Sequence, residues 1–535
     1  MTETTATTFI EVSTSAGRVR GRWRGEPGAG GSAAFLGIPF AKPPVGERRF
    51  AAPEPPEPWD GVRDALEHGA TAQRGDTGIT LIPEPSVAGE STLNVNVFTP
   101  VPGQTDAALP VLVWIHGGGF ISGSPASPWY DGRAFNRDGV VTATISYRLG
   151  FDGFGHIDGA PPNRGVRDWL AALEWMQENI AQFGGDPSRV TIAGQSAGGG
   201  AVLTLLGMPV AQHLFHAAWS LSGALADVSV ERSRSASARL ARLAGVAPTR
   251  EGFASVAEEA LHALQTKAGE PESSDRLAGA RSLLEEGLSW GPAIDGDLLP
   301  QPTIDSLRAG VGADKPLVLG TTDDEFTMVT DGAKRALRLV PASVALSRLG
   351  VSRARRREYL ADNAAQRRKG TAAVLGRYVT DVVFRSTVVR VAEARGAAPT
   401  WVYRFMWPSP TRRWALHCLD VPFWFDCLDD EHVAAIAGDA PPRSLAAAVH
   451  GSAVALVRGD DPGWRPWSEA PGTTRIFGGE ASVVDVLPDG YASVRALVSP
   501  APRVASGSRS RALTPPDQLS AAMTSRSNSS TPDRS

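Results

Sequence analysis

Buried strands that alternate with helical patterns constrain the fold of this chain more than any other feature. The segment LPVLVWIHGG at 109–118 is a continuous apolar run that ends in glycines, and GVVTATISY at 139–147 is another such run. Runs of this kind are typical of strands that are buried on both faces. Residues 167–183 then place apolar side chains at helical spacing, and RVTIAGQSAGGG has the pattern of a strand followed by a turn. The alternation predicts an α/β fold with a mostly parallel sheet.

Further elements extend this pattern toward both ends of the chain. Strands are predicted within 9–40, 93–100, 315–325 and 401–407, and a helix at 448–459. Residues 231–288 are rich in Ala, Arg, Leu and Glu, which predicts a helical insertion over the sheet. From about residue 501 the composition changes to Ser, Pro, Arg and Thr, which predicts a disordered tail.

The composition is that of an ordinary globular protein. The chain has 535 residues, of which 42% are hydrophobic, and its formal net charge is −4. The apolar content excludes a wholly disordered chain, and two cysteines are too few for a disulfide scaffold. The balance of 53 basic and 57 acidic residues argues against a nucleic-acid partner. Length alone predicts three or four domains of about 150 residues each.

No segment has the character of a membrane span or a secretion signal. The longest apolar runs, such as 109–115, fall short of the ~20 residues that a membrane helix needs. The N-terminal segment lacks a basic region followed by an apolar one. We therefore expect no membrane span and a cytoplasmic location, where Cys418 and Cys427 would be free thiols.

The segment Gly194-Gln195-Ser196-Ala197-Gly198 matches the pattern G-x-S-x-G between a predicted strand and a predicted helix. Small residues allow a tight, strained turn that exposes the serine hydroxyl at the end of the strand. In a chain with 57 glycines a chance match is the alternative. The strand–turn–helix context favours Ser196 as a nucleophile.

A serine nucleophile needs a site that stabilises the oxyanion of its intermediate. The segment His116-Gly117-Gly118-Gly119 follows the buried strand 109–115, and consecutive glycines let backbone N–H groups turn toward one point. Such a motif supplies part of the oxyanion hole in many serine hydrolases. A flexible turn or a phosphate loop is the alternative, but no G-K-[ST] follows.

The serine also needs a base, which is expected downstream if the order is serine, acid, histidine. Six histidines follow Ser196, namely His213, His216, His262, His417, His432 and His450. The first two follow too closely for an acid-bearing strand to intervene, and the third lies in the helical insertion. His432 lies in an acidic, surface-like run, and His450 on an Ala-rich helix where simple packing explains it. His417 lies in a loop after strand 401–407, and this position favours it as the base.

The acid is expected at the end of another strand. Asp323, Asp324 and Glu325 lie just past the strand KPLVLG, and catalytic groups in such sheets gather at the carboxyl ends of strands. The pattern by itself does not choose among the three, and an acidic surface loop is the alternative.

The chain resembles the type-B carboxylesterases, the family that includes the cholinesterases and the bacterial para-nitrobenzyl-type esterases. The resemblance runs from about residue 10 to 490. The motifs that carry it are FLGIPFAKPPVGERRF at 35–50, ESTLNVNVFTP at 90–100, WIHGGGF at 114–120, SYRLGFDGF at 146–154, NRGVRDWLAALEWMQENIAQFGGDPSRVTIAGQSAGG at 163–199, LFHAAWSLSGA at 214–224, WGPAIDGDLLP at 290–300, LGTTDDE at 319–325 and ALHCLDVPF at 415–423.

The resemblance implies one large α/β-hydrolase domain over 1–505, with helical insertions, followed by the disordered tail at 506–535. It further implies the following site residues: Ser196 as nucleophile, His417 as base, Glu325 as acid, and the N–H groups of Gly118, Gly119 and Ala197 as the oxyanion hole. Asp323 and Asp324 are then expected to be solvated loop residues.

Three positions depart from the family pattern. Gln195 stands where the family usually has Glu, and Phe326 where it usually has Gly after the acid. Thr92 stands at the position of a cysteine that forms an early disulfide in the family, which agrees with the cytoplasmic expectation.

The predicted function is hydrolysis of carboxylic esters through an acyl-enzyme with a Ser-His-Glu triad. The expected partner is a small ester, and no metal or organic cofactor is implied. The alternatives are hydrolysis of an amide, carbamate or lactone by the same triad, and a non-catalytic cholinesterase-like binding protein. The second would typically lack a triad residue, whereas all three are present.

Overall fold

The computed structural model describes residues 8–28, 30–75, 81–269, 281, 284, 287–479 and 485–498, and all of these lie in one compact unit. The predicted tail, 506–535, lies outside the described residues. The tail and the domain boundary at 505 therefore stay predictions.

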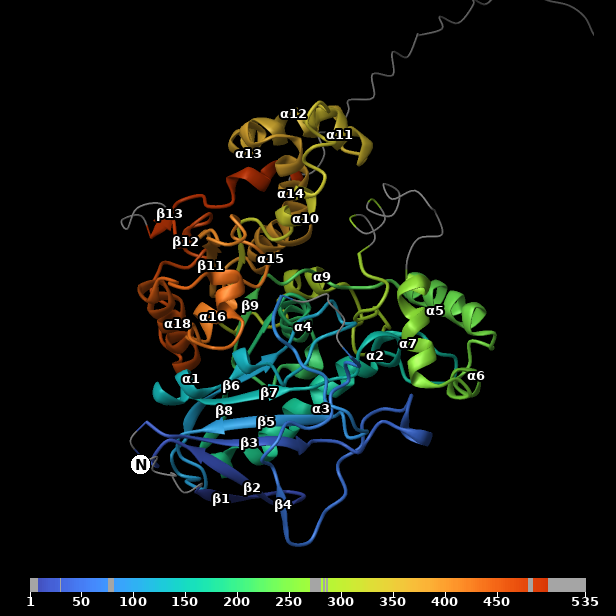
Figure 1. Ribbon diagram of the computed structural model, residues 1–535, viewed down its shortest axis with the longest axis vertical. Helices are drawn as coiled ribbons and strands as arrows, with labels where there is room; N and C mark the ends of the chain where they lie inside the picture. Colours follow the sequence, from blue (N-terminus) through green and yellow to red (C-terminus); the bar gives the residue numbers. More distant parts are fainter. Residues whose placement is uncertain are drawn as a thin grey trace, which may run out of the picture. The chain divides into compact units, whose positions relative to one another are not determined.

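The described residues form one sheet of thirteen strands, which runs across the molecule in Figure 1. The strands are β1 (Phe9–Thr14), β2 (Gly17–Arg24), β3 (Ser32–Pro39), β4 (Val62–Asp64), β5 (Asn94–Thr99), β6 (Leu109–Ile115), β7 (Val141–Ile145), β8 (Gly185–Gln195), β9 (Ala217–Leu221), β10 (Leu317–Thr322), β11 (Thr400–Phe405), β12 (Thr474–Phe477) and β13 (Val486–Leu487). Their order is β1-β2-β3-β5-β7-β6-β8-β9-β10-β11-β12-β13, with β4 beside β2.

The centre of the sheet is parallel and its margins are antiparallel. Every neighbouring pair from β7 to β12 runs in parallel. The pairs between β1, β2, β3, β5 and β7, and the pair β12–β13, are antiparallel. The predicted mostly parallel sheet is confirmed.

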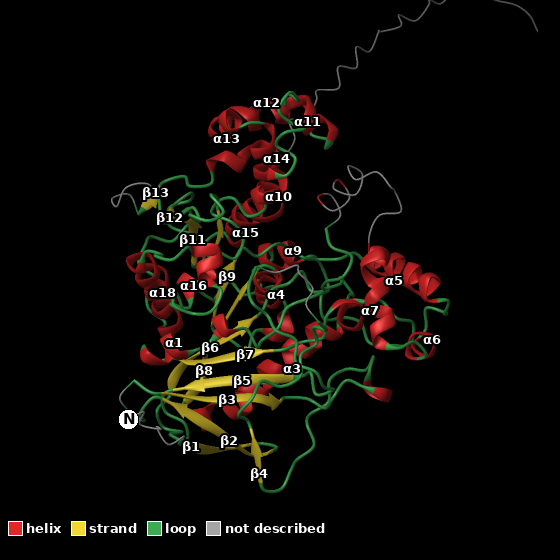
Figure 2. Ribbon diagram, viewed as in Figure 1, coloured by secondary structure: helices red, strands yellow, loops and turns green. Residues whose placement is uncertain are grey.

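Helices, red in Figure 2, connect and cover the strands. The α-helices are α1 (Arg133–Arg137), α2 (Gly150–Phe154), α3 (Arg164–Asn179), α4 (Ala197–Leu206), α5 (Val230–Ala244), α6 (Arg250–Ala254), α7 (Glu258–Gly269), α9 (Thr303–Arg308), α10 (Thr327–Asp331), α11 (Ala342–Arg348), α12 (Arg353–Asp362), α13 (Ala364–Lys369), α14 (Thr371–Thr380), α15 (Ser386–Arg395), α16 (Val421–Trp424), α17 (Val433–Ala437), α18 (Arg443–Arg458) and α19 (Arg495–Val498). The 3₁₀ turns are η1 (Gly46–Arg48), η2 (Pro128–Tyr130), η3 (Ile180–Phe183), η4 (Pro209–Ala211) and η6 (Ala492–Val494), and η5 (Asp381–Arg385) is a π-helical turn.

Alternate side chains of β6 enter two separate cores, which explains why its sequence is apolar throughout. Val113 belongs to the core that contains Trp169 of α3, whereas Trp114 belongs to the core that contains Trp424 of α16 and Val457 of α18. Successive side chains of a strand point to opposite faces, so helices cover both faces of the sheet.

The predicted elements are largely present. The helical insertion appears as α5, α6 and α7, although much of the stretch from 270 to 286 lies outside the described residues. The helices α11 to α15 and the strands β12 and β13 were not among the predicted elements. In the described part of the chain, no helix is both long and apolar enough to cross a membrane.

The parallel centre of the sheet positions the predicted site. The carboxyl ends of parallel strands meet at one edge. His116 follows β6, Ser196 follows β8, and Glu325 comes three residues after β10. The loop that holds His417 follows β11. Four strands of the parallel centre, with β9 lying between β8 and β10, therefore deliver the predicted residues to one edge.

Candidate active site

Ser196 occupies a strained turn between β8 and α4. Its backbone angles are φ 58° and ψ −121°, a region that side-chain-bearing residues rarely adopt. Hydrogen bonds fix the turn on both sides. The N–H of Ser196 donates to the carbonyl of Leu221 at 2.9 Å, and the carbonyl of Ser196 accepts from Gly200 N–H at 2.9 Å. The side chain is half-buried and so remains accessible. This geometry presents the hydroxyl at the sheet edge, as the motif predicts.

The two glycines of the motif are required by close backbone contacts. A Cβ on Gly194 would lie 2.5 Å from the carbonyl carbon of Gly198. A Cβ on Gly198 would lie 2.0 Å from the carbonyl oxygen of Ile115. Both distances are far inside van der Waals contact, so the turn packs against the end of β6 only because these positions lack side chains.

The loop after β6 presents free amide groups beside this turn. Gly118 and Gly119 have φ of 98° and 62°, which turns the backbone away from the strand direction. Within the described residues, the N–H groups of Gly118, Gly119 and Ala197 donate to no acceptor. Ala197 is the first residue of α4, where backbone N–H groups lack helical partners. Three unpaired donors at the sheet edge are suited to bind an oxyanion.

His116 is buried at the start of this loop. Its side chain is 1% exposed, and burial lowers its pKa to about 4, so the ring is neutral at pH 7. The ring stacks on Tyr147 with 4.5 Å between ring centroids, and the Tyr147 hydroxyl donates to the carbonyl of His116 at 3.0 Å.

His417 and Glu325 form a buried pair. His417 Nδ1 lies 2.5 Å from Glu325 Oε2, and the backbone N–H of His417 donates to the carbonyl of Glu325 at 3.0 Å. The other carboxylate oxygen, Oε1, accepts the N–H of Thr322 at 2.9 Å. Glu325 is fully buried, so both of its oxygens have fixed partners. Of the three adjacent carboxylates, Glu325 is the one that contacts His417.

The far nitrogen of the ring meets Gln195. Gln195 Nε2 lies 3.1 Å from His417 Nε2, and both side chains are buried. Within the described residues, Ser196 Oγ makes no hydrogen bond to the ring of His417, and Gln195 is the side chain that contacts Nε2.

Two phenylalanines pack against the imidazole of His417. The ring centroid of Phe326 lies 5.0 Å from that of His417, and the ring of Phe384 lies at 5.1 Å. Phe384 belongs to the π-helical turn η5. Phe326, which departs from the family pattern, therefore covers His417, and the apolar rings restrict water at the His417–Glu325 pair.

Charge and burial act in opposite directions on His417. Burial lowers the pKa of the imidazole, whereas its charged surroundings raise it, and the pKa lies above its ordinary value of 6.5. The groups that raise it are the adjacent Cys418 and then Glu325, through charge and side-chain hydrogen bonding.

Asp323 and Asp324 are not solvated loop residues, and that expectation is wrong. Each is 8% exposed. Asp323 accepts two hydrogen bonds of 2.8 Å from Arg404, and Asp324 accepts one of 2.9 Å from Arg377. The helix α14, which carries Arg377, was not among the predicted elements, whereas Arg404 lies on β11, within the predicted strand 401–407.

Asp420 is a further residue beside the pair that the sequence pattern did not single out. Its carboxyl is 1% exposed, and burial followed by the charge of Glu325 raises its pKa to about 7. Tyr403 donates its hydroxyl to Asp420 at 3.2 Å. The only signal in the sequence is its position three residues after His417.

The remaining histidines lie where the sequence placed them. His450 is buried in α18, with Nδ1 2.8 Å from the carbonyl oxygen of Trp424. His432 is exposed beside Glu431. Among the described residues, no group of three His, Cys, Asp or Glu side chains could hold a metal ion.

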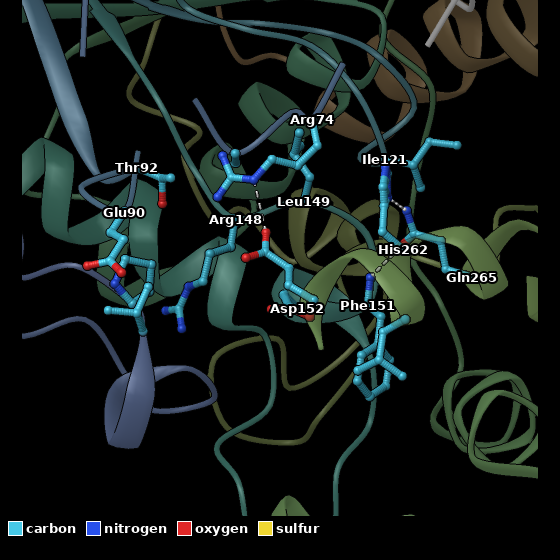
Figure 3. Close-up of a pocket in the computed structure, with 15 residues that line it drawn as sticks. Arg74, Glu90, Thr92, Ile121, Arg148, Leu149, Phe151, Asp152, His262 and Gln265 are labelled. Carbon is cyan, nitrogen blue, oxygen red and sulfur yellow. Dashed lines mark hydrogen bonds and ion pairs between the residues drawn. The ribbon is translucent and has the colours of Figure 1, made fainter. Parts of the chain in front are cut away.

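A separate cavity lies beyond the loop of Gly118 and Gly119, between the N-terminal loops and the helices α2 and α7 (Figure 3). Its lining includes Ile121, whose N–H donates to the carbonyl of Gly118 at 3.1 Å. Polar groups in its wall pair within the protein: Arg74 with Glu258 at 3.3 Å, and Gln265 with His262 at 2.8 Å.

Comparisons with known proteins show the family to which this chain is similar. The carboxylesterase family model matches residues 8–432. The para-nitrobenzyl esterase of Bacillus subtilis is 35% identical over 435 residues, which cover 78% of this chain and 83% of that protein. A medium-chain fatty acyl-CoA hydrolase precursor of Anas platyrhynchos is 35% identical over 428 residues, 74% of each chain.

Solved structures of esterases also match this chain. A Geobacillus stearothermophilus carboxylesterase matches with a TM-score of 0.76 and 32% identity, over 91% of this chain and all of that chain. A structure of a para-nitrobenzyl esterase matches with a TM-score of 0.75 and 31% identity, over 92% of this chain and all of that one. The α/β-hydrolase fold that the sequence predicts is confirmed.

Proposed function

The chain belongs to the carboxylesterase family and is a carboxylic ester hydrolase, and we propose that it works through an acyl-enzyme on Ser196 with His417 as base and Glu325 as acid. The observation that carries this proposal is the buried His417–Glu325 pair at 2.5 Å, at the same sheet edge as the strained Ser196 turn.

In the first half of the reaction, Ser196 Oγ attacks the ester carbonyl carbon while its proton passes to His417 Nε2. Glu325 accepts Nδ1–H and stabilises the imidazolium that forms. The oxyanion is bound by the N–H groups of Gly118, Gly119 and Ala197. Collapse of the intermediate expels the alcohol, which takes the proton from His417.

In the second half, water attacks the acyl carbonyl carbon and gives its proton to His417 Nε2. The second tetrahedral intermediate releases the acid, and Ser196 regains its proton. The unpaired state of the three amides in the described structure supports their role, because no internal hydrogen bond has to break when the oxyanion forms.

The proposal is tested by Ser196→Ala and by labelling. Ser196→Ala should lower kcat on a para-nitrophenyl ester by about 10⁴ or more, because the chemistry loses its nucleophile. The exposed Ser255 provides a matched control, and Ser255→Ala should keep wild-type activity. Mass spectrometry should place an organophosphate adduct on Ser196. An adduct on another serine, or an active Ser196→Ala, would overturn the proposal.

We also propose a cytoplasmic location. The supporting observation is that Cys418 and Cys427 are both free thiols, as is usual in a reducing compartment. Fractionation of cells that express the full chain tests this location.

A further inference from the structure

The contact between Gln195 and His417 restricts the protonation state of the ring. Glu325 Oε2 is the hydrogen-bond acceptor at Nδ1, so Nδ1 carries the proton in the neutral ring. Nε2 is then unprotonated and presents a lone pair. Of the two ends of an amide, only the NH₂ group can pair with a lone pair, and Gln195 Nε2 is the atom that lies 3.1 Å away.

We propose that Gln195 is a positioning residue for the base: its side-chain amide donates a hydrogen bond to Nε2 of neutral His417 and occupies, in the resting enzyme, the lone pair that must receive the Ser196 proton. The inference rests on the proposed function, since it concerns the base of that triad.

Because Gln195 and His417 are both buried, the hydrogen bond between them affects the protonation of the ring. Gln195 is 1% exposed and His417 is 7% exposed, so little water competes for either atom. Gln195 ends β8, where the β-sheet pairs it with Leu221 of β9, so its backbone is fixed. The side chain also packs against the oxyanion loop, because a Cβ on Gly117 would lie 3.1 Å from Gln195 Oε1. One amide thus contacts His417 and lies close to the loop that begins at His116.

The amide favours one state of the base over the other. It stabilises the neutral ring by donating to it, and it cannot do so once Nε2 carries a proton. The amide must therefore be displaced in each half-reaction. The titratable groups that face the ring are Glu325 from the loop after β10, and Cys418 and Asp420 from its own loop, whereas Phe326 and Phe384 are uncharged.

Two substitutions of Gln195 change this contact in different ways. Gln195→Met keeps the approximate volume and removes the hydrogen-bond donor. The midpoint of the acid limb of kcat/KM should therefore shift to higher pH by about half a pH unit to one pH unit. Gln195→Glu is nearly isosteric and brings a carboxylate to Nε2 of His417. The midpoint of the acid limb should therefore shift to higher pH by about 1–3 pH units. Gln104→Glu makes the same chemical change in an exposed loop before β6, at the opposite end of that strand, and should leave the limb in place.

The measurement is the pH dependence of kcat/KM and, independently, of the rate of organophosphate inactivation, which does not involve product release. In addition, ¹⁵N spectra of histidine-labelled protein above the acid limb should show a hydrogen-bonded Nε2 in both wild type and Ser196→Ala. This holds because Gln195 supplies the donor. The spectra need no Gln195 variant, so they test the proposal even if such a variant does not fold.

The outcomes separate this inference from the proposed function. If folded Gln195→Met and Gln195→Glu keep the wild-type acid limb, or if Ser196→Ala frees Nε2, the role of Gln195 is refuted while the triad stands. If Ser196→Ala remains active or the adduct lies elsewhere, the triad itself fails.

Discussion

Replacing Glu325 with glutamine should disable the base by changing which ring nitrogen of His417 carries the proton. Thr322 N–H donates to Oε1 of Glu325 at 2.9 Å, and His417 Nδ1 lies 2.5 Å from Oε2. A glutamine amide has one acceptor end and one donor end. Its oxygen pairs with the fixed N–H of Thr322, because the reverse orientation would place two donors face to face. Its NH₂ group then meets Nδ1, and the proton moves to Nε2.

The magnitude follows from this change of tautomer. Nε2 would present a proton instead of a lone pair toward Ser196, and the imidazolium would lose its carboxylate in a site where Glu325 is fully buried. Such a substitution in a serine–histidine–acid triad costs about 10⁴ in kcat. This factor corresponds to about 5.5 kcal/mol of transition-state stabilisation.

The assay compares kcat on one para-nitrophenyl ester for Glu325→Gln and Asp324→Asn, with circular dichroism to establish folding. Asp324 is the matched control, because it is the adjacent buried carboxylate and pairs with Arg377 instead of His417. Asp324→Asn should change kcat by less than about tenfold and lower the free energy of unfolding by about 1–3 kcal/mol.

Two results would refute this reasoning. The first is a folded Glu325→Gln that retains a substantial part of wild-type kcat. The second is an Asp324→Asn that loses more kcat than Glu325→Gln, which would make Asp324 the acid and the observed His417–Glu325 contact incidental.

Two further predictions concern the base and the turn. Because only neutral His417 accepts a proton and its pKa lies above 6.5, kcat/KM should fall as the pH falls through a midpoint above 6.5; a midpoint well below this value contradicts the assignment. Gly198→Ala should abolish activity and destabilise the fold, since its Cβ would lie 2.0 Å from the Ile115 carbonyl oxygen. Gly451→Ala, in α18 where no atom lies within 4 Å of the new Cβ, should raise the free energy of unfolding by about 0.5–1 kcal/mol; denaturant titration of both variants checks the contrast.

Local patterns were sufficient to predict the sheet and the tight turn at Ser196. The strands β6 and β7 are apolar throughout because both faces of the sheet are covered, and this pattern is visible in the sequence. The turn at Ser196 was predictable because the small residues that allow it lie within four positions of Ser196 in the sequence. The helices α11 to α15 carry weaker local patterns and were not predicted.

The family resemblance, and not spacing, selected Glu325 among three adjacent carboxylates. The structure shows why spacing cannot do so. The three side chains point to different partners: Asp323 to Arg404, Asp324 to Arg377 and Glu325 to His417. These partners lie 53 to 92 residues away along the chain.

The sequence by itself determined the local features of this protein, namely the strand pattern, the glycine-lined turn at Ser196 and the consecutive glycines of the oxyanion loop. Only the tertiary structure decided what faces the base. Gln195 follows directly from the end of β8, yet its contact with His417 spans 222 residues, and Phe384 reaches the same ring from a π-helical turn. Backbone geometry depends on neighbours in sequence, whereas the protonation state of a buried ring depends on whichever side chains the fold brings within hydrogen-bond distance.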